Sequence, residues 1–113
     1  MRGVLAAGVA VLALAGPAAA ADHRCAQDVL QRAARLLALH YEVEADAPQI
    51  FVDAESLETL PPVKALAGTG SFDVVEVYGY IYKAEYRMRF IYAQIPDSCV
   101  LMGQEILEAS DPY

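Results

Sequence analysis

Basic side chains are scarce in this chain of 113 residues, which has 8 Lys and Arg residues against 15 Asp and Glu and a formal net charge of -7. Favourable contact with a nucleic-acid backbone or an anionic membrane surface depends largely on Lys and Arg side chains. The acidic balance therefore excludes nucleic acid as an expected partner.

Motifs that carry catalysis or bind a fixed cofactor are also missing from the sequence. It contains no G-x-S-x-G elbow, no H-E-x-x-H motif, no phosphate-binding glycine loop and no calcium loop. The carboxylates between residues 42 and 58 show no spacing of a defined acid–base pair, and His40 falls on the apolar stripe of an expected helix, where a partly buried structural role is favoured. We therefore predict a non-enzymatic protein with no catalytic residue and no cofactor.

Long hydrophobic runs are confined to the beginning of the chain, where Arg2 is followed by an apolar stretch over 4–14, a Gly-Pro pair and several alanines. This stretch is too short for a membrane span, which takes roughly 20 apolar residues. A basic start, a short apolar middle and small residues at an A-x-A site are typical of a secretory signal peptide. We predict a cleaved signal peptide at 1–20, with a cut after Ala20 or, as the alternative, after Ala21.

The expected mature chain, residues 21–113, is long enough for one small domain and too short for two. It holds no second apolar run of membrane-spanning length, so no membrane anchor is expected after cleavage. These features predict a periplasmic or secreted protein.

Cysteine is limited to Cys25 and Cys99. The absence of a C-x-x-C spacing argues against a redox pair, and two cysteines in a small exported domain favour a structural disulfide. Closing so long a loop would stabilise the fold by about 4 kcal/mol on the chain-entropy model.

The first regular element expected is a helix over 22–42, because apolar side chains recur there at spacings of three and four residues. Asp22 is a suitable N-cap. Residues 49–53 form a short candidate strand. The segment 54–71 is open among helix, strand and loop, with helical turns over 54–60 as one interpretation.

A β-hairpin is predicted over 72–95, with a four-residue loop around 82–85. Ile81 then pairs with Tyr86, and the side chains of both strands divide between a buried and an amphipathic face. In this register Tyr80 stands opposite Arg87. A slip by one residue would bury the arginines.

A turn is expected at 96–98. Residues 99–107 then favour a third long strand, with a helix capped by Asp97 or Ser98 as the alternative. We predict an α+β fold in which an N-terminal helix packs on a three- to four-stranded antiparallel meander, with one intramolecular disulfide. The helix is expected to cover the face that carries Val75, Val77 and Phe90.

Tyrosines give the strongest functional signal in the sequence. Tyr78, Tyr80 and Tyr82 recur at every second position, and Arg87 and Arg89 are expected opposite them. Because tyrosine offers a large contact area with a polar tip, we predict a binding surface for an unknown protein or glycan of the cell envelope. The alternative is that this ladder only stabilises the sheet, or is covered by 54–71 or by a second copy.

A second candidate function is metal handling. Cleavage after Ala20 would leave Ala21-Asp22-His23 at the N-terminus, with an amine, two amides and an imidazole in reach of one Cu(II) or Ni(II) ion. Cleavage after Ala21 would remove this motif, so the role of His23 as a metal ligand depends on the cut. A small hydrolase that uses His23, His40 and the acidic stretch is a further alternative.

Overall fold

The computed structural model describes residues 23–113. The predicted signal peptide at 1–20, both cleavage sites and the proposed N-cap Asp22 lie outside the described residues.

The described part begins with one helix, α3 (Ala26–Tyr41), within the predicted range. Its buried side chains recur at the expected spacings and form one apolar stripe. These residues are Ala26, Val29, Ala33, Leu37 and Ala38. The helix ends where Glu42 adopts a left-handed conformation with φ of 57°, a conformation common just after a helix.

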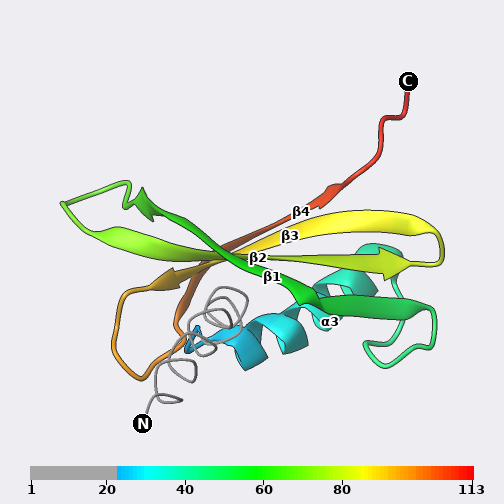
Figure 1. Ribbon diagram of the computed structural model, residues 1–113, viewed down its shortest axis with the longest axis horizontal. Helices are drawn as coiled ribbons and strands as arrows, with labels where there is room; N and C mark the ends of the chain where they lie inside the picture. Colours follow the sequence, from blue (N-terminus) through cyan, green and yellow to red (C-terminus); the bar gives the residue numbers. More distant parts are fainter. Residues whose placement is uncertain (1–22) are drawn as a thin grey trace, which may run out of the picture.

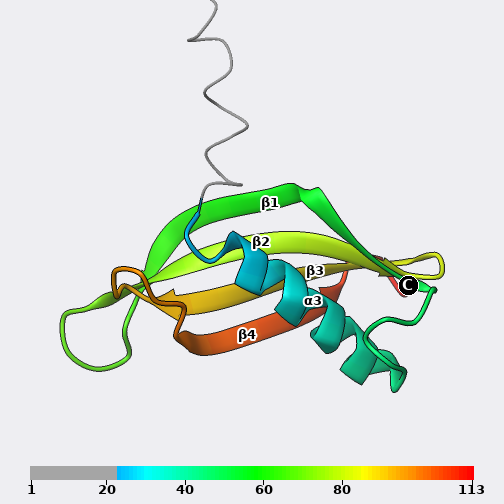
Figure 2. The ribbon, with the colours of Figure 1, turned by 90° about the horizontal axis from the view of Figure 1, so that it is seen from below.

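Four strands follow and form one antiparallel sheet in the order β1-β2-β3-β4. They are β1 (Ile50–Lys64), β2 (Ser71–Ile81), β3 (Ala84–Ala93) and β4 (Leu101–Glu108). The helix lies along one face of this sheet, and no described element covers the opposite face (Figures 1 and 2). The predicted α+β fold with a helix on an antiparallel meander is confirmed. We call the uncovered side the outer face.

The core lies between α3 and the face of the sheet that sequence reasoning assigned to it. Val75, Val77 and Phe90 are fully buried and share one cluster with the apolar stripe of the helix. The helix packs closely against the sheet at Gly79, where an added Cβ would lie 2.7 Å from Cδ1 of Leu37. A side chain at this position would occupy the space that Leu37 fills.

The segment 54–64 continues strand β1, so the interpretation of 54–60 as helical turns is wrong. The ladder with β2 shifts between Asp53 and Glu58, and the hydroxyl of Ser56 accepts a 2.8 Å hydrogen bond from the amide of Tyr78. This bulge turns Leu57 into the core, where it is 8 % exposed. Burial of one leucine thus overrides the weak local helical preference.

The two consecutive prolines, at 61 and 62, lie within β1 at its second register shift, between Leu60 and Val63. Proline has no amide hydrogen for a ladder and occurs in sheets at edges and bulges. β1 is an edge strand, because it is the first strand of the sheet, and the two prolines lie at one of its bulges. The prolines therefore lie within an edge strand and do not end a helical segment over 54–60.

The β2–β3 hairpin has a different register from the predicted one. Ile81 pairs with Ala84, and the loop holds only two residues, with Tyr82 at a φ of 56°. We had expected a longer loop because a tight loop of this kind favours Gly or Asn at a positive φ. The change is two residues, an even number, so every side chain keeps its predicted face while its cross-strand partner changes.

The tighter hairpin adds contacts that offset the unfavourable backbone of Tyr82. Tyr80 pairs with Glu85 and its hydroxyl donates a 2.9 Å hydrogen bond to that carboxylate. The register also places Glu76 opposite Arg89. An ion pair and an additional pair of ladder residues thus decide the register.

The predicted last strand is confirmed in position but starts later, at Leu101, so Cys99 precedes β4. The expected turn before it is present, with Pro96 followed by Asp97 at a φ of 59°. The disulfide between Cys25 and Cys99 is formed, with the Cα atoms 5.6 Å apart. It ties the loop before β4 to the beginning of α3.

Candidate functional site

The outer face carries four of the five residues of the predicted binding surface. Tyr78 and Tyr80 lie on β2 and are half-buried, and Arg87 and Arg89 lie beside them on β3. The actual register sets Tyr78 opposite Arg87, whereas we had predicted Tyr80 there. The structure brings these four side chains together on a surface that α3 does not reach.

Tyr82, the fifth residue of the predicted surface, lies in the hairpin loop and not on the strand. Its ring centroid is 6.4 Å from that of Tyr41, the last residue of α3. The ladder of tyrosines therefore ends at Tyr80, because Tyr82 lies in the loop after β2 and its ring is near α3.

Phe51 on β1 extends the aromatic surface, and sequence reasoning missed it. Its ring lies 6.1 Å from that of Tyr80, and the residue is 60 % exposed. The signal was present in the sequence: Ile50 and Val52 share one side of the candidate strand 49–53, and alternation leaves Phe51 as a large apolar side chain on the other side.

The two arginines of the outer face are engaged by carboxylates. Nε of Arg89 donates a 2.8 Å hydrogen bond to Glu76, which is 6 % exposed, and Nε of Arg87 is 3.8 Å from the same oxygen. Glu105 on β4 completes the group, 3.3 Å from the terminal nitrogen of Arg87. Two cations and two anions thus form a mixed network across β2, β3 and β4.

This network sets the electrostatics of the surface. The hydrogen bond to Glu76 raises the pKa of Arg89, with burial acting in the opposite direction, and the hydrogen bond to Glu85 raises the pKa of Tyr80. Arg87 keeps one buried nitrogen, Nε, without a hydrogen-bond partner among residues 23–113. The two arginines of the outer face are therefore neutralised by Glu76 and Glu105, and the aromatic strip of Phe51, Tyr80 and Tyr78 beside them has the further carboxylate of Glu85 at Tyr80.

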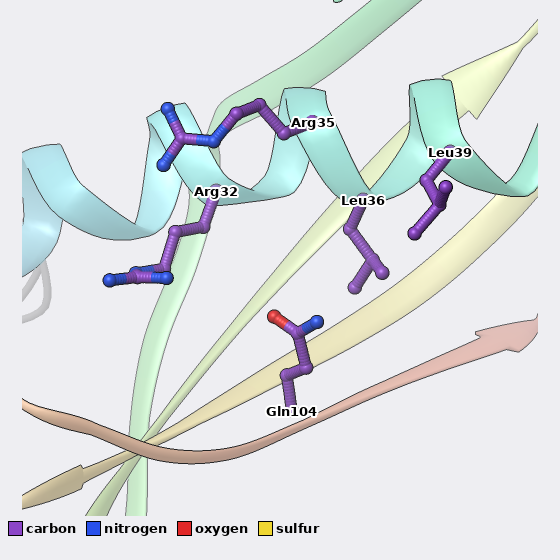
Figure 3. Close-up of a pocket in the computed structure, with 5 residues that line it drawn as sticks. All are labelled: Arg32, Arg35, Leu36, Leu39 and Gln104. Atoms are coloured by element: carbon purple, nitrogen blue, oxygen red, sulfur yellow. The ribbon is translucent and has the colours of Figure 1, made fainter.

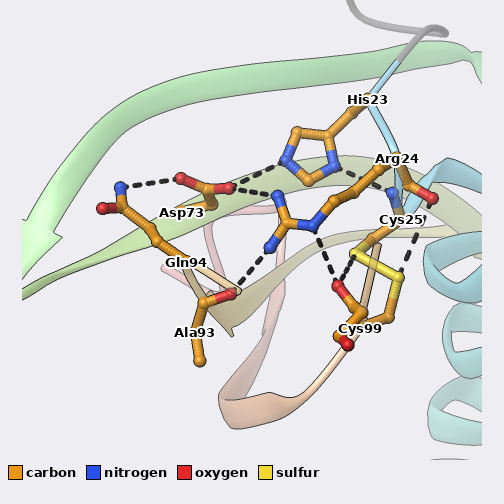
Figure 4. Close-up of polar contacts among 8 residues, drawn as sticks. His23, Arg24, Cys25, Asp73, Ala93, Gln94 and Cys99 are labelled. Carbon is orange, nitrogen blue, oxygen red and sulfur yellow. Dashed lines mark hydrogen bonds and ion pairs between the residues drawn. A yellow bond between two sulfur atoms is a disulfide. The ribbon is translucent and has the colours of Figure 1, made fainter. Parts of the chain in front are cut away.

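At the other end of the sheet, Arg24 holds the loop before β4 in place (Figure 4). Its guanidinium donates hydrogen bonds to the carbonyl oxygens of Ser98 and Ala93, at 2.8 and 2.7 Å, and to the carboxylate of Asp73 at 2.7 Å. This group, which we call the Arg24 clamp, lies beside the disulfide. Both fix the same loop against the start of α3.

His23 belongs to the same group, and both of its ring nitrogens have partners (Figure 4). Nδ1 accepts a 3.0 Å hydrogen bond from the amide of Cys25, which leaves the proton on Nε2, 3.2 Å from Asp73. Burial by itself would raise the pKa of Asp73, but hydrogen bonds from Arg24, Gln94 and His23 outweigh it and lower the pKa. A metal at Nδ1 of His23 would have to displace the Cys25 amide. Ala21 and Asp22 lie outside the described residues.

The other candidate catalytic groups are not brought together. His40 is exposed, where we had expected partial burial, and its ring packs edge-on against Tyr86 at 5.1 Å. Within residues 23–113, no three His, Cys, Asp or Glu side chains form a group that could hold a metal ion. His23 and His40 lie near opposite ends of the helical segment, next to Asp73 and Tyr86 respectively.

No protein-family model, curated protein sequence or solved structure matches this chain. No relative or related fold therefore points to an enzyme. In the described part, the single helix is neither long nor apolar enough to cross a bilayer.

Proposed function

We propose that this protein is a small exported binding module that recognises a protein or glycan of the cell envelope through its outer face. One observation carries the proposal: an antiparallel sheet is covered by a helix on one side only, and its bare side presents neighbouring aromatic rings. A solvated sheet face is ordinary when its side chains are polar. Here Phe51, 60 % exposed, departs from that pattern.

The chemistry of the surface favours recognition over catalysis. Tyr78 and Tyr80 supply flat contact area with hydroxyl groups, which suits the centre of a protein interface or the face of a sugar ring. The arginines next to them are already paired through Glu76, whereas Glu85 accepts a hydrogen bond from Tyr80 and has no ion pair among residues 23–113. A partner can cover the arginines without burying an isolated cation, which lowers the desolvation cost of binding.

The disulfide supports the exported location, because such bonds persist in oxidising compartments. It is compatible with the predicted signal peptide, and so is the lack of a spanning helix among residues 23–113. Metal handling receives less support, since both ring nitrogens of His23 are engaged within the fold.

Affinity capture from the envelope of the producing organism tests the proposal, with the oxidised mature domain as bait. The double variant Tyr78→Ser/Tyr80→Ser should fold, because both side chains lie outside the core cluster, and should lose the captured partner. Tyr113→Ser is the matched control, since Tyr113 is fully exposed in the C-terminal tail away from the sheet. Equal recovery of the partner by the double variant and the wild type would contradict the proposal.

A further inference from the structure

The two edges of the sheet differ in how they are protected against pairing with another strand. Edge strands expose unpaired amides and carbonyls, and proteins commonly block them with bulges, prolines or charges. β1 carries two register shifts, two prolines and the acidic residues Asp53, Glu55 and Glu58. β4 has eight residues and no proline, lysine or arginine, but it carries Glu105 and Glu108 and one register shift near its start. β4 is therefore the less protected of the two edges.

The β4 edge borders an open pocket of about 140 Å³ between α3 and β4 (Figure 3). One wall is the helix, which contributes Arg32, Arg35, Leu36 and Leu39. The other wall is Gln104 of β4. The pocket exists because α3 packs mainly over β1 and β2 and leaves the helix-side face of β4 partly open, as Figure 2 shows.

The charge of this pocket is unusual for so acidic a chain. Nε of Arg32 is held by Asp28 at 2.7 Å, whereas Arg35 has no carboxylate within ion-pair distance among residues 23–113. Leu39 is 73 % exposed next to it. The helix wall therefore presents, beside exposed apolar surface, one cation that has no ion pair among residues 23–113 and acts on Asp28 only from a greater distance.

We propose that β4 and α3 together form a second binding site, which takes an extended peptide segment of a partner protein by strand addition. Main-chain hydrogen bonds would join the segment to the free edge of β4, and alternate side chains would enter the pocket. Residues i and i+2 of a strand lie about 6.6 Å apart, close to the roughly 6 Å between helix positions four apart. One side chain can thus face Arg35 while the next faces Leu39.

The charge of the site selects an acidic and apolar segment. A carboxylate placed at Arg35 gains an ion pair that the chain itself does not supply, and an aliphatic side chain two residues away covers Leu39. A second copy of this chain is a poorer occupant, because each copy carries a net charge of -7 and like charges repel. This site is separate from the outer face, so the two can be tested independently.

The test uses the synthetic peptide TLTETLT, capped at both ends, and amide chemical shifts of the oxidised mature domain in solution. We expect shifts confined to β4 and the pocket wall, and at least about tenfold weaker binding for TLTKTLT, in which lysine replaces glutamate. Arg35→Glu should reverse this preference. Lys64→Glu, which makes the same charge change at the end of β1, should leave it unchanged, and Leu39→Ser should weaken binding of both peptides.

Two N-methylated forms of the peptide separate strand addition from simple side-chain docking. Because only every second residue of an added strand pairs with the edge, methylation of one alternate set of amides should abolish binding, and methylation of the other set should not. Equal effects of both sets would overturn the proposal. So would the absence of shifts up to about 1 mM peptide, shifts on β1 or the outer face, or a dimer that pairs through β4 without peptide.

Discussion

The guanidinium of Arg24 and the carboxylate of Asp73 lie 2.7 Å apart and join the segment two residues before α3 to the start of β2. The same guanidinium also binds two carbonyl oxygens of the loop before β4. One side chain thus connects three parts of the chain that are distant in sequence. The disulfide links the start of the helical segment to the same loop. Two separate interactions therefore stabilise the end of the sheet that is remote from the β2–β3 hairpin.

Substitution of Asp73 by asparagine tests the Arg24 clamp. We expect Asp73→Asn to lower the free energy of unfolding by about 1 to 3 kcal/mol at neutral pH, since the guanidinium loses a charged acceptor. Urea denaturation provides the measurement. Asp46→Asn, in an exposed loop, should change little, and a loss of the same size in both variants would argue against the clamp.

The pH dependence of the same pair follows from its lowered pKa. The folded pKa of Asp73 is below its ordinary value of 3.8, so its contribution to stability is present above that value and is lost as the pH falls through the folded pKa. The difference in stability between wild type and Asp73→Asn should therefore shrink in strong acid. A difference that stays constant down to acid denaturation would contradict this assignment.

Removal of the disulfide should be the most destabilising of these changes. The bond closes a loop with a sequence separation of 74 residues, and the chain-entropy model gives a loss of about 4 kcal/mol for the double variant Cys25→Ala/Cys99→Ala. The clamp should keep the native arrangement detectable by near-ultraviolet circular dichroism at low temperature. An unchanged melting temperature after reduction would show that the bond does not contribute.

Gly79 is expected to accommodate even a methyl side chain only at a cost in stability. Gly79→Ala would bring a Cβ to within 2.7 Å of Leu37 and 3.0 Å of Met88, and overpacking of this kind costs about 1 to 3 kcal/mol. Gly103→Ala is the matched control, because its Cβ would meet only Ile91 at an ordinary 3.6 Å. The denaturation midpoints of the two variants should be compared. A larger decrease for Gly79→Ala would assign the destabilisation to the close contact with Leu37, because both variants replace a strand glycine by alanine.

Alkaline titration should reveal two late tyrosines. Burial, together with a hydrogen bond involving Tyr41, raises the pKa of Tyr86 to about 12, and burial with the hydrogen bond to Asp28 raises that of Tyr92 as well. The two tyrosines contribute to the free energy of unfolding below the ordinary pKa of 10. This contribution is lost as the pH rises through their raised pKa values in the folded protein. Tyrosinate absorbance should show this late phase, reduced in Tyr86→Phe, and a curve with no such phase would refute it.

The sequence predicted which face of the hairpin each side chain occupies, but it did not predict the cross-strand partner of each residue. Alternation of apolar and polar residues from Val75 to Phe90 determines which side chains are buried, and an even change of register leaves that pattern intact. The choice between two even registers depends on contacts such as Arg89 with Glu76. Such contacts between strands cannot be ranked from sequence periodicity alone.

The amino-acid sequence by itself determined the helix stripe, the inward side of the hairpin and the cysteine pairing, because each rests on local periodicity or on a single possible combination. Tertiary structure decided the continuation of β1 through its prolines, the position of Tyr82 in a tight loop, the exposure of Phe51 beside Tyr80, and the pocket at Arg35. These features depend on where a helix lies across a twisted sheet. That position follows from packing between distant residues, such as Leu37 against Gly79, which no local pattern encodes.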